Sequence, residues 1–362
     1  MERNPNPAPE AAGVSRRGKV WSLIFKIVVP LVITVGLCYI LFSRQDFGQM
    51  VAIVRSDCNW RWIVLALVIS VFSHIFRAMR WRIQLRAIGI EVPLFPVVLS
   101  IFGTYAVNLV LPRLGELWRT GYIAQRQNAP FDSVFGSMVA DRLADTVTVA
   151  LLTLFTFIFA GGPLLDFLQQ KADHTAFEGL VAILSSPALY AAGAAALLLV
   201  WWVVRRFRNS APVDAAVRFC KGLWRGFSVV ATMPGRGRWL LLTVCVWGCY
   251  FTQLYVAFFA FPATAQVVAD HGVGAVMVCF VLSSISMVVP SNGGIGPWQI
   301  AVVFALGIYS QGIPALTTAY ATSFANLVMG SQTLLLIALG LFTFICIALD
   351  RRRSAHPTRR RR

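Results

Sequence analysis

Charge is scarce in this sequence, and acidic residues are the scarcest of the charged types. Of its 362 residues, 13% are charged, with only 15 Asp or Glu against 32 Lys or Arg. Hydrophobic residues make up 57%, and the mean hydropathy is +0.70. This composition excludes an ordinary soluble domain, in which about a quarter of residues are charged. It predicts a polytopic membrane protein with little chain left for a soluble catalytic domain.

The residue patterns that build metal, disulfide and catalytic sites are also missing. The seven cysteines form no CxxC pair and no Cys/His cluster, and the four histidines are scattered. Neither a zinc site nor a disulfide framework is therefore predicted. The sequence has no HExxH pair, no grouping of Ser, His and Asp, and no glycine-rich phosphate loop after a strand. We therefore expect no catalytic residue, no metal and no cofactor.

Basic residues are plentiful, and they flank hydrophobic runs. The net charge is +17. Because the arginines do not gather in a basic domain, we expect contact with anionic lipid headgroups and no binding of nucleic acid. Residues 205–238 hold eight basic residues and one acid, which predicts a cytoplasmic loop. Because residues 161–186 contain one basic residue and residues 261–272 contain none, both segments are predicted to be external loops. Both termini should be cytoplasmic.

The order of apolar runs divides the chain. Residues 1–19 are predicted to be a disordered basic N-terminus, residues 20–349 a transmembrane domain, and residues 350–362 a basic cytoplasmic tail. The first apolar run is long enough to stay as a membrane helix, and it is not a convincing cleavable signal peptide. Full or partial spans are predicted within residues 23–42, 61–80, 96–111, 133–160, 187–204, 239–261 and 317–349.

One apolar run contains a break. Residues 286–299 (SMVVPSNGGIGPWQ) lie inside an uncharged run, residues 272–309. Pro290 and Pro297 lack the N–H group that a helix needs, and the three glycines between them allow backbone angles that a helix does not use. A broken helix at membrane depth is tolerated only where protein or a water-filled cavity surrounds it. In transporters such breaks form the substrate site.

A second break has a matching pattern. Residues 108–115 (NLVLPRLG) align with residues 286–293 (SMVVPSNG), so that a polar residue is followed by Pro four positions later and by Gly three after that. The order span, span, broken segment, span also occurs twice. We therefore expect one repeat over residues 20–160 and another over residues 187–349.

The number of crossings per repeat sets the topology. If each broken segment is a re-entrant hairpin, each repeat has three full crossings, and the second repeat is inverted relative to the first. The alternative, in which residues 272–309 make two ordinary crossings, stays open. The predicted fold class is all-α, with about six full transmembrane helices and two broken or re-entrant hairpins, or six to eight spans, in an inverted-repeat architecture.

The first break is followed by the most polar stretch beside any span. Arg113, Glu116 and Arg119 are spaced three apart, so they would share one face of a helix. Arginine side chains match phosphate oxygens in two-point contacts. The sharper hypothesis is a lipid-phosphate site made by Arg113 and Arg119, with Glu116 orienting them or contacting a cationic headgroup. The alternative is a cytoplasmic loop with local ion pairs.

Three charged residues open the next span. Charges within membrane helices normally face the protein interior and pair. Arg142 can pair with Asp145 on the same helix, while Asp141 and Asp145 share a face and can pair outward with Arg113 or Arg119. These residues predict a structural ion network, or alternatively a direct substrate contact.

Two more arginines lie within the predicted span 61–80. Arg77 and Arg80 follow His74 at a helical spacing of three. Because both lie near the predicted cytoplasmic end of the span, we expect them to extend to the lipid headgroups.

Three motifs together resemble the lysylphosphatidylglycerol synthase transmembrane (flippase-like) family. They are residues 108–119 (N-xxx-P-R-xx-G-E-xx-R), residues 141–145 (DRxxD) and residues 290–296 (P-xx-GG-x-G). The similarity of order and spacing covers residues 21–349. The family includes the flippase half of bacterial multiple-peptide-resistance proteins, so the resemblance implies movement of aminoacylated phospholipid between membrane leaflets. We expect the chain to lie in a bacterial inner membrane. Stand-alone members are linked to hopanoid, glycolipid or polyprenyl-linked sugar pathways.

Two departures from the family limit that implication. The aminoacyl-transferring domain of the full synthases is not found in the sequence, so we expect a stand-alone member that does not aminoacylate lipid by itself. Gln299 stands where the family pattern implies a glutamate. Because a neutral amide cannot hold a cationic headgroup as a carboxylate would, the case for lysyl-phosphatidylglycerol weakens and the lipid class stays open.

We therefore predict a transporter, or flippase, for a phosphate-bearing phospholipid or glycolipid. The alternative is a non-transporting partner of a lipid- or glycan-modifying enzyme, and a homo-oligomer is compatible with either. A third hypothesis is an enzyme acting on lipid phosphate, with Glu116, Asp141 or Asp145 as base. The candidate substrate-binding residues are Asn108, Arg113, Glu116, Arg119, Asp141, Arg142, Asp145, Pro290, Asn292, Gly293, Gly294 and Gln299.

Overall fold

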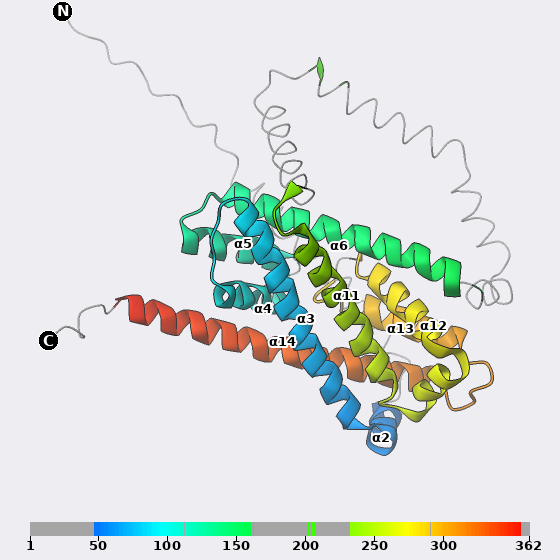
Figure 1. The fold of residues 1–362 in the computed structure, drawn as a ribbon. Helices are drawn as coiled ribbons and strands as arrows, with labels where there is room; N and C mark the ends of the chain where they lie inside the picture. The colour runs from blue at the N-terminus through cyan, green and yellow to red at the C-terminus, as the bar shows by residue number, and fades with distance from the viewer. Residues whose placement is uncertain are drawn as a thin grey trace, which may run out of the picture.

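The computed structural model describes residues 47–111, 113–160, 162, 202, 205–206, 232–289 and 291–355. The predicted span 23–42, the N-terminus 1–19, Pro112 and Pro290 lie outside the described residues. So does most of the predicted span 187–204 and of the predicted loops 161–186 and 205–238. The regular structure of the described residues is entirely helical (Figure 1).

Nine helices make up the described parts of the chain. The first five are α2 (Phe47–Asp57), α3 (Trp60–Ala87), α4 (Leu94–Val110), α5 (Leu114–Gln127) and α6 (Phe131–Ala160). The other four are α11 (Arg236–Phe258), α12 (Pro262–Ser286), α13 (Pro297–Ile308) and α14 (Thr318–Ala355).

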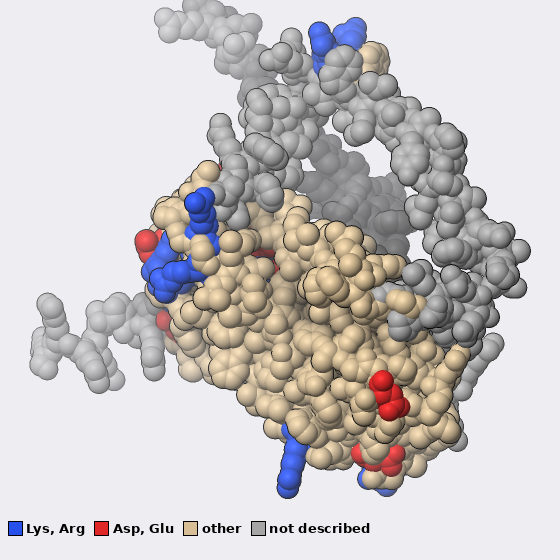
Figure 2. Space-filling model, turned by 45° about the vertical axis from the view of Figure 1, so that its right-hand side comes forward, with Lys and Arg blue, Asp and Glu red and all other residues tan. Residues whose placement is uncertain are grey.

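Five of the described helices, α3, α6, α11, α12 and α14, are long and apolar enough to cross a membrane, and α4 and α13 are shorter apolar helices. Large apolar side chains of α6 face outward, with Ile158 67% and Phe159 72% exposed. On the face shown in Figure 2, nearly all charged side chains lie toward the ends of the molecule and a broad uncharged surface separates them. An uncharged band of this kind suits the hydrocarbon core of a bilayer. The protein is thus an all-α polytopic membrane protein, as predicted.

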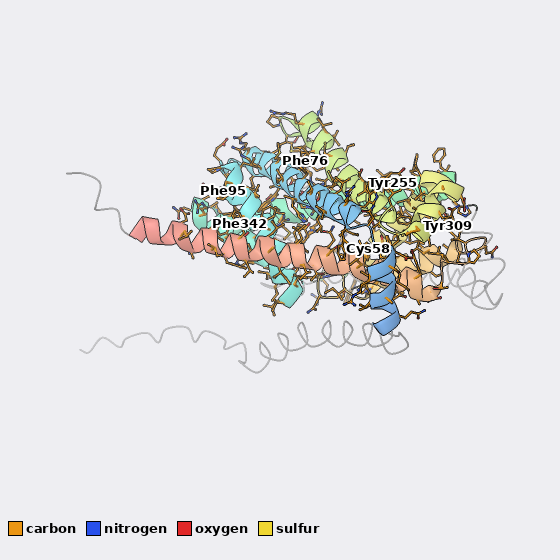
Figure 3. The ribbon with its side chains drawn as sticks, turned by 90° about the horizontal axis from the view of Figure 1, so that it is seen from below. Cys58, Phe76, Phe95, Tyr255, Tyr309 and Phe342 are labelled. Atoms are coloured by element: carbon orange, nitrogen blue, oxygen red, sulfur yellow. The ribbon has the colours of Figure 1, made fainter. Side chains whose placement is uncertain are left out.

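Helices distant in sequence pack together. α3 and α11 lie side by side along much of their length, and α14 runs the length of the molecule past α4 and α13 (Figures 1 and 3). In Figure 3, Phe95 of α4 and Phe342 of α14 lie toward one end, and Tyr309 and Cys58 toward the other.

Two apolar clusters form the core. The larger joins α11, α12, α13 and α14 around fully buried residues such as Val302 and Phe324. The smaller joins α3, α4, α5 and α6 around Trp81, Ile101 and Ile123. Each cluster therefore contains residues from the two helices that flank one of the broken segments.

The element order repeats. α3, the pair α4–α5 and α6 are followed later by α11, the pair α12–α13 and α14. The two aligned stretches fall at the same place in this order, between α4 and α5 and between α12 and α13. The inverted orientation of the two halves stays a prediction.

Two boundaries differ from the prediction. Residues 261–272 were expected to form an external loop, but α12 begins at Pro262 and continues through a kink at Gly272, where φ is 67° and ψ is −161°. Proline suits the first turn of a helix because its missing N–H would be unpaired there anyway. α14 continues to Ala355, inside the predicted tail 350–362, because its last residues contain no helix breaker.

Candidate functional site

The two breaks meet. Nη2 of Arg113, beside the first break, donates a hydrogen bond of 3.0 Å to the carbonyl oxygen of Val288 in the second. Nδ2 of Asn292 in turn donates to the carbonyl oxygen of Leu109 at 3.3 Å. A Cβ added to Gly293 would lie 2.6 Å from Cδ2 of Leu109, and the positive φ of 62° at this position also favours glycine. Two stretches predicted from separate parts of the sequence therefore form one junction.

The backbone at the junction is left-handed, as the glycines predict. The φ angles are 62° at Gly293, 85° at Gly294 and 96° at Gly296. Arg113 also has a positive φ of 61°, which is uncommon for a residue with a side chain and costs on the order of 1 kcal/mol. This conformation keeps α4 and α5 from forming one continuous helix. It also directs the exposed side chain of Arg113 toward the second break.

Asn108 bridges the first break. Its Oδ1 accepts a hydrogen bond of 2.8 Å from the backbone N–H of Gly115, and its Nδ2 donates to Oε2 of Glu116 at 3.3 Å. The side chain thus satisfies a backbone donor that the start of α5 leaves without a helical partner. Asn108 holds α4 and α5 in their present geometry.

Gln299 bridges the second break in the same manner. Its Oε1 accepts from the backbone N–H of Gly296 at 2.6 Å, and its Nε2 donates to Oδ1 of Asn326 at 3.4 Å. The side chain is buried, with 4% exposed. An amide offers both an acceptor and a donor here, whereas an ionised glutamate would offer acceptors only. In this structure Gln299 therefore has a local structural role.

We predict that Gly115→Ala destabilises the protein by about 1–3 kcal/mol, as overpacking a tight contact does. A Cβ at this position would collide with the backbone oxygen of Thr104 and lie 2.8 Å from Oδ1 of Asn108. The midpoint of denaturation in SDS–lipid micelles measures the effect. Gly121→Ala on the same helix is the matched control, because its Cβ would meet nothing within 4 Å. The control should keep or raise stability, since alanine favours a helix over glycine. Equal stabilities for the two variants would contradict the packing.

A buried ion network lies beside the junction. Nη2 of Arg80 contacts Oδ1 of Asp141 at 2.6 Å and Oδ1 of Asp145 at 2.8 Å. Nη2 of Arg77 lies 2.9 Å from Oδ2 of Asp145. The side chains of these four residues are between 0% and 12% exposed. The network therefore ties α3 to α6 within the protein interior.

α5 joins the same network. Nη2 of Arg119 lies 3.6 Å from Oδ2 of Asp141, and its guanidinium carbon lies 4.5 Å from the centre of the Trp81 ring. Arg142 pairs with Glu116 and also lies 4.0 Å from Asp145. Among the described residues, four arginines thus face three carboxylates, which gives one surplus positive charge when all seven groups are ionised.

The second half of the chain reaches this network through a tyrosine. Nε of Arg77 donates to the hydroxyl of Tyr250 on α11 at 3.2 Å. The hydroxyls of Tyr250 and Tyr105 are 3.4 Å apart. Neither tyrosine was among the predicted site residues, because nothing on its own helix marks it as a partner for a charge.

The expected position of Arg77 and Arg80 was wrong. Both were expected to extend to lipid headgroups, but they are only 3% and 0% exposed. Their carboxylate partners belong to α6, more than 50 residues further along the chain. Spacing on one helix cannot show such partners.

The prediction that Arg113, Glu116 and Arg119 share one face of a helix was also wrong. α5 begins at Leu114, so Arg113 precedes the helix. Arg113 is exposed at the junction, whereas Arg119 is buried with 1% exposed. The predicted pairs of Arg142 with Asp145 and of Asp141 with Arg119 are found. The substrate-binding role of the candidate residues stays a prediction.

Comparison with known proteins gives a family. The family model described as "Lysylphosphatidylglycerol synthase TM region" matches residues 27–347. "Glycosyltransferase AglD" of Haloferax volcanii is 24% identical over 323 residues, which is 82% of this chain and 51% of that protein. A UPF0104 membrane protein of Pyrococcus horikoshii is 27% identical over 135 residues, or 36% of this chain and 40% of that protein.

The matches to individual proteins are partial, which limits what they imply about the function of this chain. The match to AglD covers only about half of the length of that protein. A UPF0104 membrane protein of Methanocaldococcus jannaschii is 22% identical over 121 residues, or 32% of this chain and 36% of that protein. No solved structure matches the chain. The family match covers most of the sequence, and the chain belongs to the family of the lysylphosphatidylglycerol synthase transmembrane region.

Proposed function

We propose that the protein moves a phosphate-bearing lipid between the leaflets of its membrane, with the junction of the two breaks as the substrate site. The meeting of two broken helices from different parts of the chain is the observation that carries the proposal. Broken helices that face each other within a membrane form the substrate sites of many transporters.

Arg113 supplies the accessible positive charge of the proposed site. Its side chain is exposed, and its partner in the second break is a neutral carbonyl oxygen. A phosphate adds a full negative charge and can accept two hydrogen bonds from the guanidinium at once, which a single neutral carbonyl cannot. A lipid phosphate therefore replaces the Val288 carbonyl as the better partner of the guanidinium.

This exchange gives a way to open the junction. The contact between the breaks includes the hydrogen bonds of Arg113 to Val288 and of Asn292 to Leu109. When phosphate takes over the guanidinium, one of these bonds is released and the two halves are freer to separate. The buried network keeps α3, α5 and α6 together meanwhile, and its surplus positive charge favours an anion nearby.

Reconstitution tests the proposal. Proteoliposomes holding the wild-type protein should move headgroup-labelled phosphate-bearing lipids faster than protein-free vesicles, as followed by quenching of the outer-leaflet label. Phosphatidylglycerol, phosphatidic acid and a polyprenyl phosphate form the substrate panel. A folded protein that moves none of them faster than empty vesicles would contradict the proposal.

The second candidate function is a non-transporting partner of a lipid- or glycan-modifying enzyme. The similarity to a protein named as a glycosyltransferase, of which the chain matches only about half, favours it. It predicts that substitution of Arg113 is harmless, while residues 205–238 are needed to capture an enzyme partner. The location in a bacterial inner membrane also stays a prediction, since the three relatives named above are archaeal.

A further inference from the structure

Glu116 places a carboxylate beside the first break. It lies in the first turn of α5, three residues after Arg113. Its side chain is 17% exposed, which makes it the most accessible of the three carboxylates in the ion network. An ionised carboxylate forms strong hydrogen bonds with ammonium groups. The partners of Glu116 therefore decide whether a cationic lipid headgroup can bind beside the junction.

The protein itself occupies the Glu116 carboxylate. Nη2 of Arg142 on α6 donates to Oε1, and Nδ2 of Asn108 lies 3.3 Å from Oε2 and 3.4 Å from Oε1. The Arg142 side chain is 36% exposed, so this pair lies at the accessible edge of the network. A bond between two ionised groups is stronger than one between neutral groups. A cationic headgroup would therefore have to displace Arg142 before it could bind here.

The charges around the pair also oppose a cationic headgroup. Arg113 is exposed at the junction, where its partner is a neutral carbonyl oxygen. The other two carboxylates of the network, Asp141 and Asp145, are 0% and 12% exposed and both contact Arg80. The described residues of the network add one surplus positive charge. Because like charges repel strongly away from bulk water, this region favours an anionic headgroup over a cationic one.

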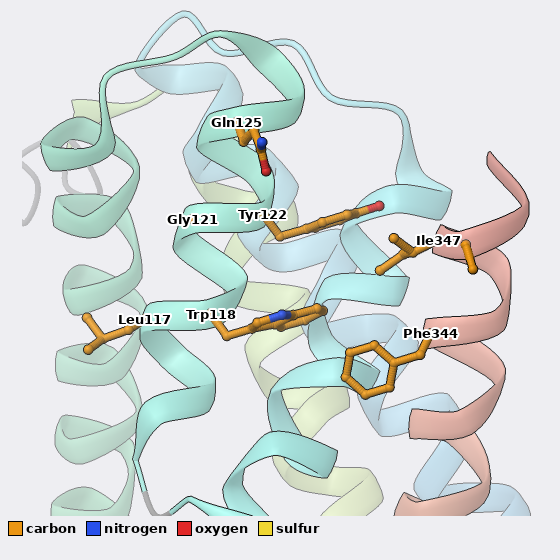
Figure 4. A pocket seen from close by; sticks show the side chains of 8 residues that line it. Leu117, Trp118, Gly121, Tyr122, Gln125, Phe344 and Ile347 are labelled. Atoms are coloured by element: carbon orange, nitrogen blue, oxygen red, sulfur yellow. The ribbon is translucent and has the colours of Figure 1, made fainter. Parts of the chain in front are cut away.

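The face of α5 that is turned toward α14 is uncharged. Figure 4 shows Trp118 and Tyr122 projecting from α5 toward Phe344 and Ile347 of α14, where they line a groove. None of the described residues that line this groove is charged. The groove therefore offers apolar contact to a lipid, but it supplies no carboxylate in place of Glu116.

We propose that the pair of Glu116 and Arg142 excludes cationic headgroups, so that the substrates of the junction are lipids with a net negative headgroup. The inference rests on the proposed transport function and names its substrate class. Arg142 determines specificity, because its guanidinium withholds the Glu116 carboxylate from a competing cation. A phospholipid whose amino groups outweigh the charge of its phosphate is therefore a poor substrate.

Lipids that differ in headgroup charge test the proposal. Phosphatidylglycerol and phosphatidic acid are anionic, lysyl-phosphatidylglycerol has a net positive charge, and one fluorescent acyl chain can label all three. In proteoliposomes of the wild-type protein, the faster anionic lipid should move by roughly tenfold or more above the rate of lysyl-phosphatidylglycerol, the factor that one hydrogen bond to a charged group supplies. Quenching of the outer-leaflet label measures these rates.

The same assay separates failure of the inference from failure of transport. Movement of lysyl-phosphatidylglycerol as fast as the anionic lipids would overturn the inference and leave transport intact. If none of the three lipids moves faster than in protein-free vesicles, the transport function is contradicted for them, and the inference falls with it.

Arg142→Gln gives a gain-of-function arm. It frees the Glu116 carboxylate for an ammonium group, so the rate for lysyl-phosphatidylglycerol relative to phosphatidylglycerol should rise about tenfold. Arg126→Gln is the matched control, because it also removes an arginine from a carboxylate, Asp350, but in the last turn of α5. Its ratio should equal that of the wild type. An unchanged ratio in folded Arg142→Gln, or an equal rise in both variants, would overturn the role of the pair.

A double variant assigns the gain to the carboxylate. Glu116→Gln combined with Arg142→Gln leaves no carboxylate beside the first break among the described residues of α5, so the gain should disappear. A gain of the same size in the double variant would overturn the role of Glu116. The comparison of lipids in the wild-type protein needs no variant, so it decides the substrate class even where a variant does not fold.

Discussion

Asp141→Asn should destabilise the protein by about 3–5 kcal/mol, the usual effect of removing one partner from a buried ion pair. Asp141 is fully buried and lies within 4.0 Å of Arg77, Arg80 and Arg119. With asparagine in its place, four arginines would face two carboxylates in the protein interior. The uncompensated charge raises the free energy of the folded state. The midpoint of denaturation in SDS–lipid micelles measures the loss.

An exposed ion pair provides the control for this prediction. Arg86 and Glu91 are 3.1 Å apart, but their side chains are 48% and 77% exposed. Exposed pairs contribute about 0–1 kcal/mol, so Glu91→Gln should change stability little. Stabilities of Asp141→Asn and Glu91→Gln that agree within about 1 kcal/mol would contradict the central role of Asp141 in the network.

The helices were the more predictable part of the fold. Apolar runs of bilayer length at residues 61–80 and 133–160 correspond to α3 and α6, because lipid requires internally paired backbone groups. The breaks were also visible, since proline and glycine act locally on the backbone. The helical residues 262–272 were missed because the positive-inside rule places charges and does not identify secondary structure.

The partners within the site were less predictable. The charged residues of the motif at 141–145 drew attention to Asp141 and Asp145, but their main partners Arg77 and Arg80 lie on α3. Such pairing depends on how helices pack, which the spacing within one helix does not encode. Arg119 was predicted to hold the lipid phosphate, but it is buried against Trp81 and lies 3.6 Å from Asp141, so its charge forms part of the ion network.

Gln299 shows how one residue changes meaning once its neighbours are known. In the sequence it was a missing carboxylate that limited the choice of lipid. In the structure its amide joins Gly296 to Asn326, and this needs both an acceptor and a donor. The neutral side chain is thus explained by local hydrogen bonding.

Arg113→Gly should slow lipid movement by roughly 10- to 100-fold, because a hydrogen bond to a charged group contributes about 1.5–3 kcal/mol. Glycine removes the guanidinium and adopts a φ of 61° without strain. The relief of backbone strain offsets the lost bond to Val288, so stability should stay within about 1 kcal/mol of the wild type. Any loss of transport then reports the side chain itself.

Arg113→Lys separates charge from geometry. Lysine keeps the positive charge but lacks the planar fork that contacts two phosphate oxygens. We expect a rate between those of the wild type and Arg113→Gly. A rate for Arg113→Lys as low as that of Arg113→Gly would assign the effect to the two-point contact alone.

The central claim is that the junction of the two breaks carries the lipid phosphate, and one measurement tests it most directly. It is the rate of movement of a labelled phosphate-bearing lipid in proteoliposomes containing wild-type or Arg113→Gly protein, matched for folded protein. The account predicts movement by the wild-type protein and a rate at least tenfold lower for the variant. Equal rates for the two folded proteins would contradict it.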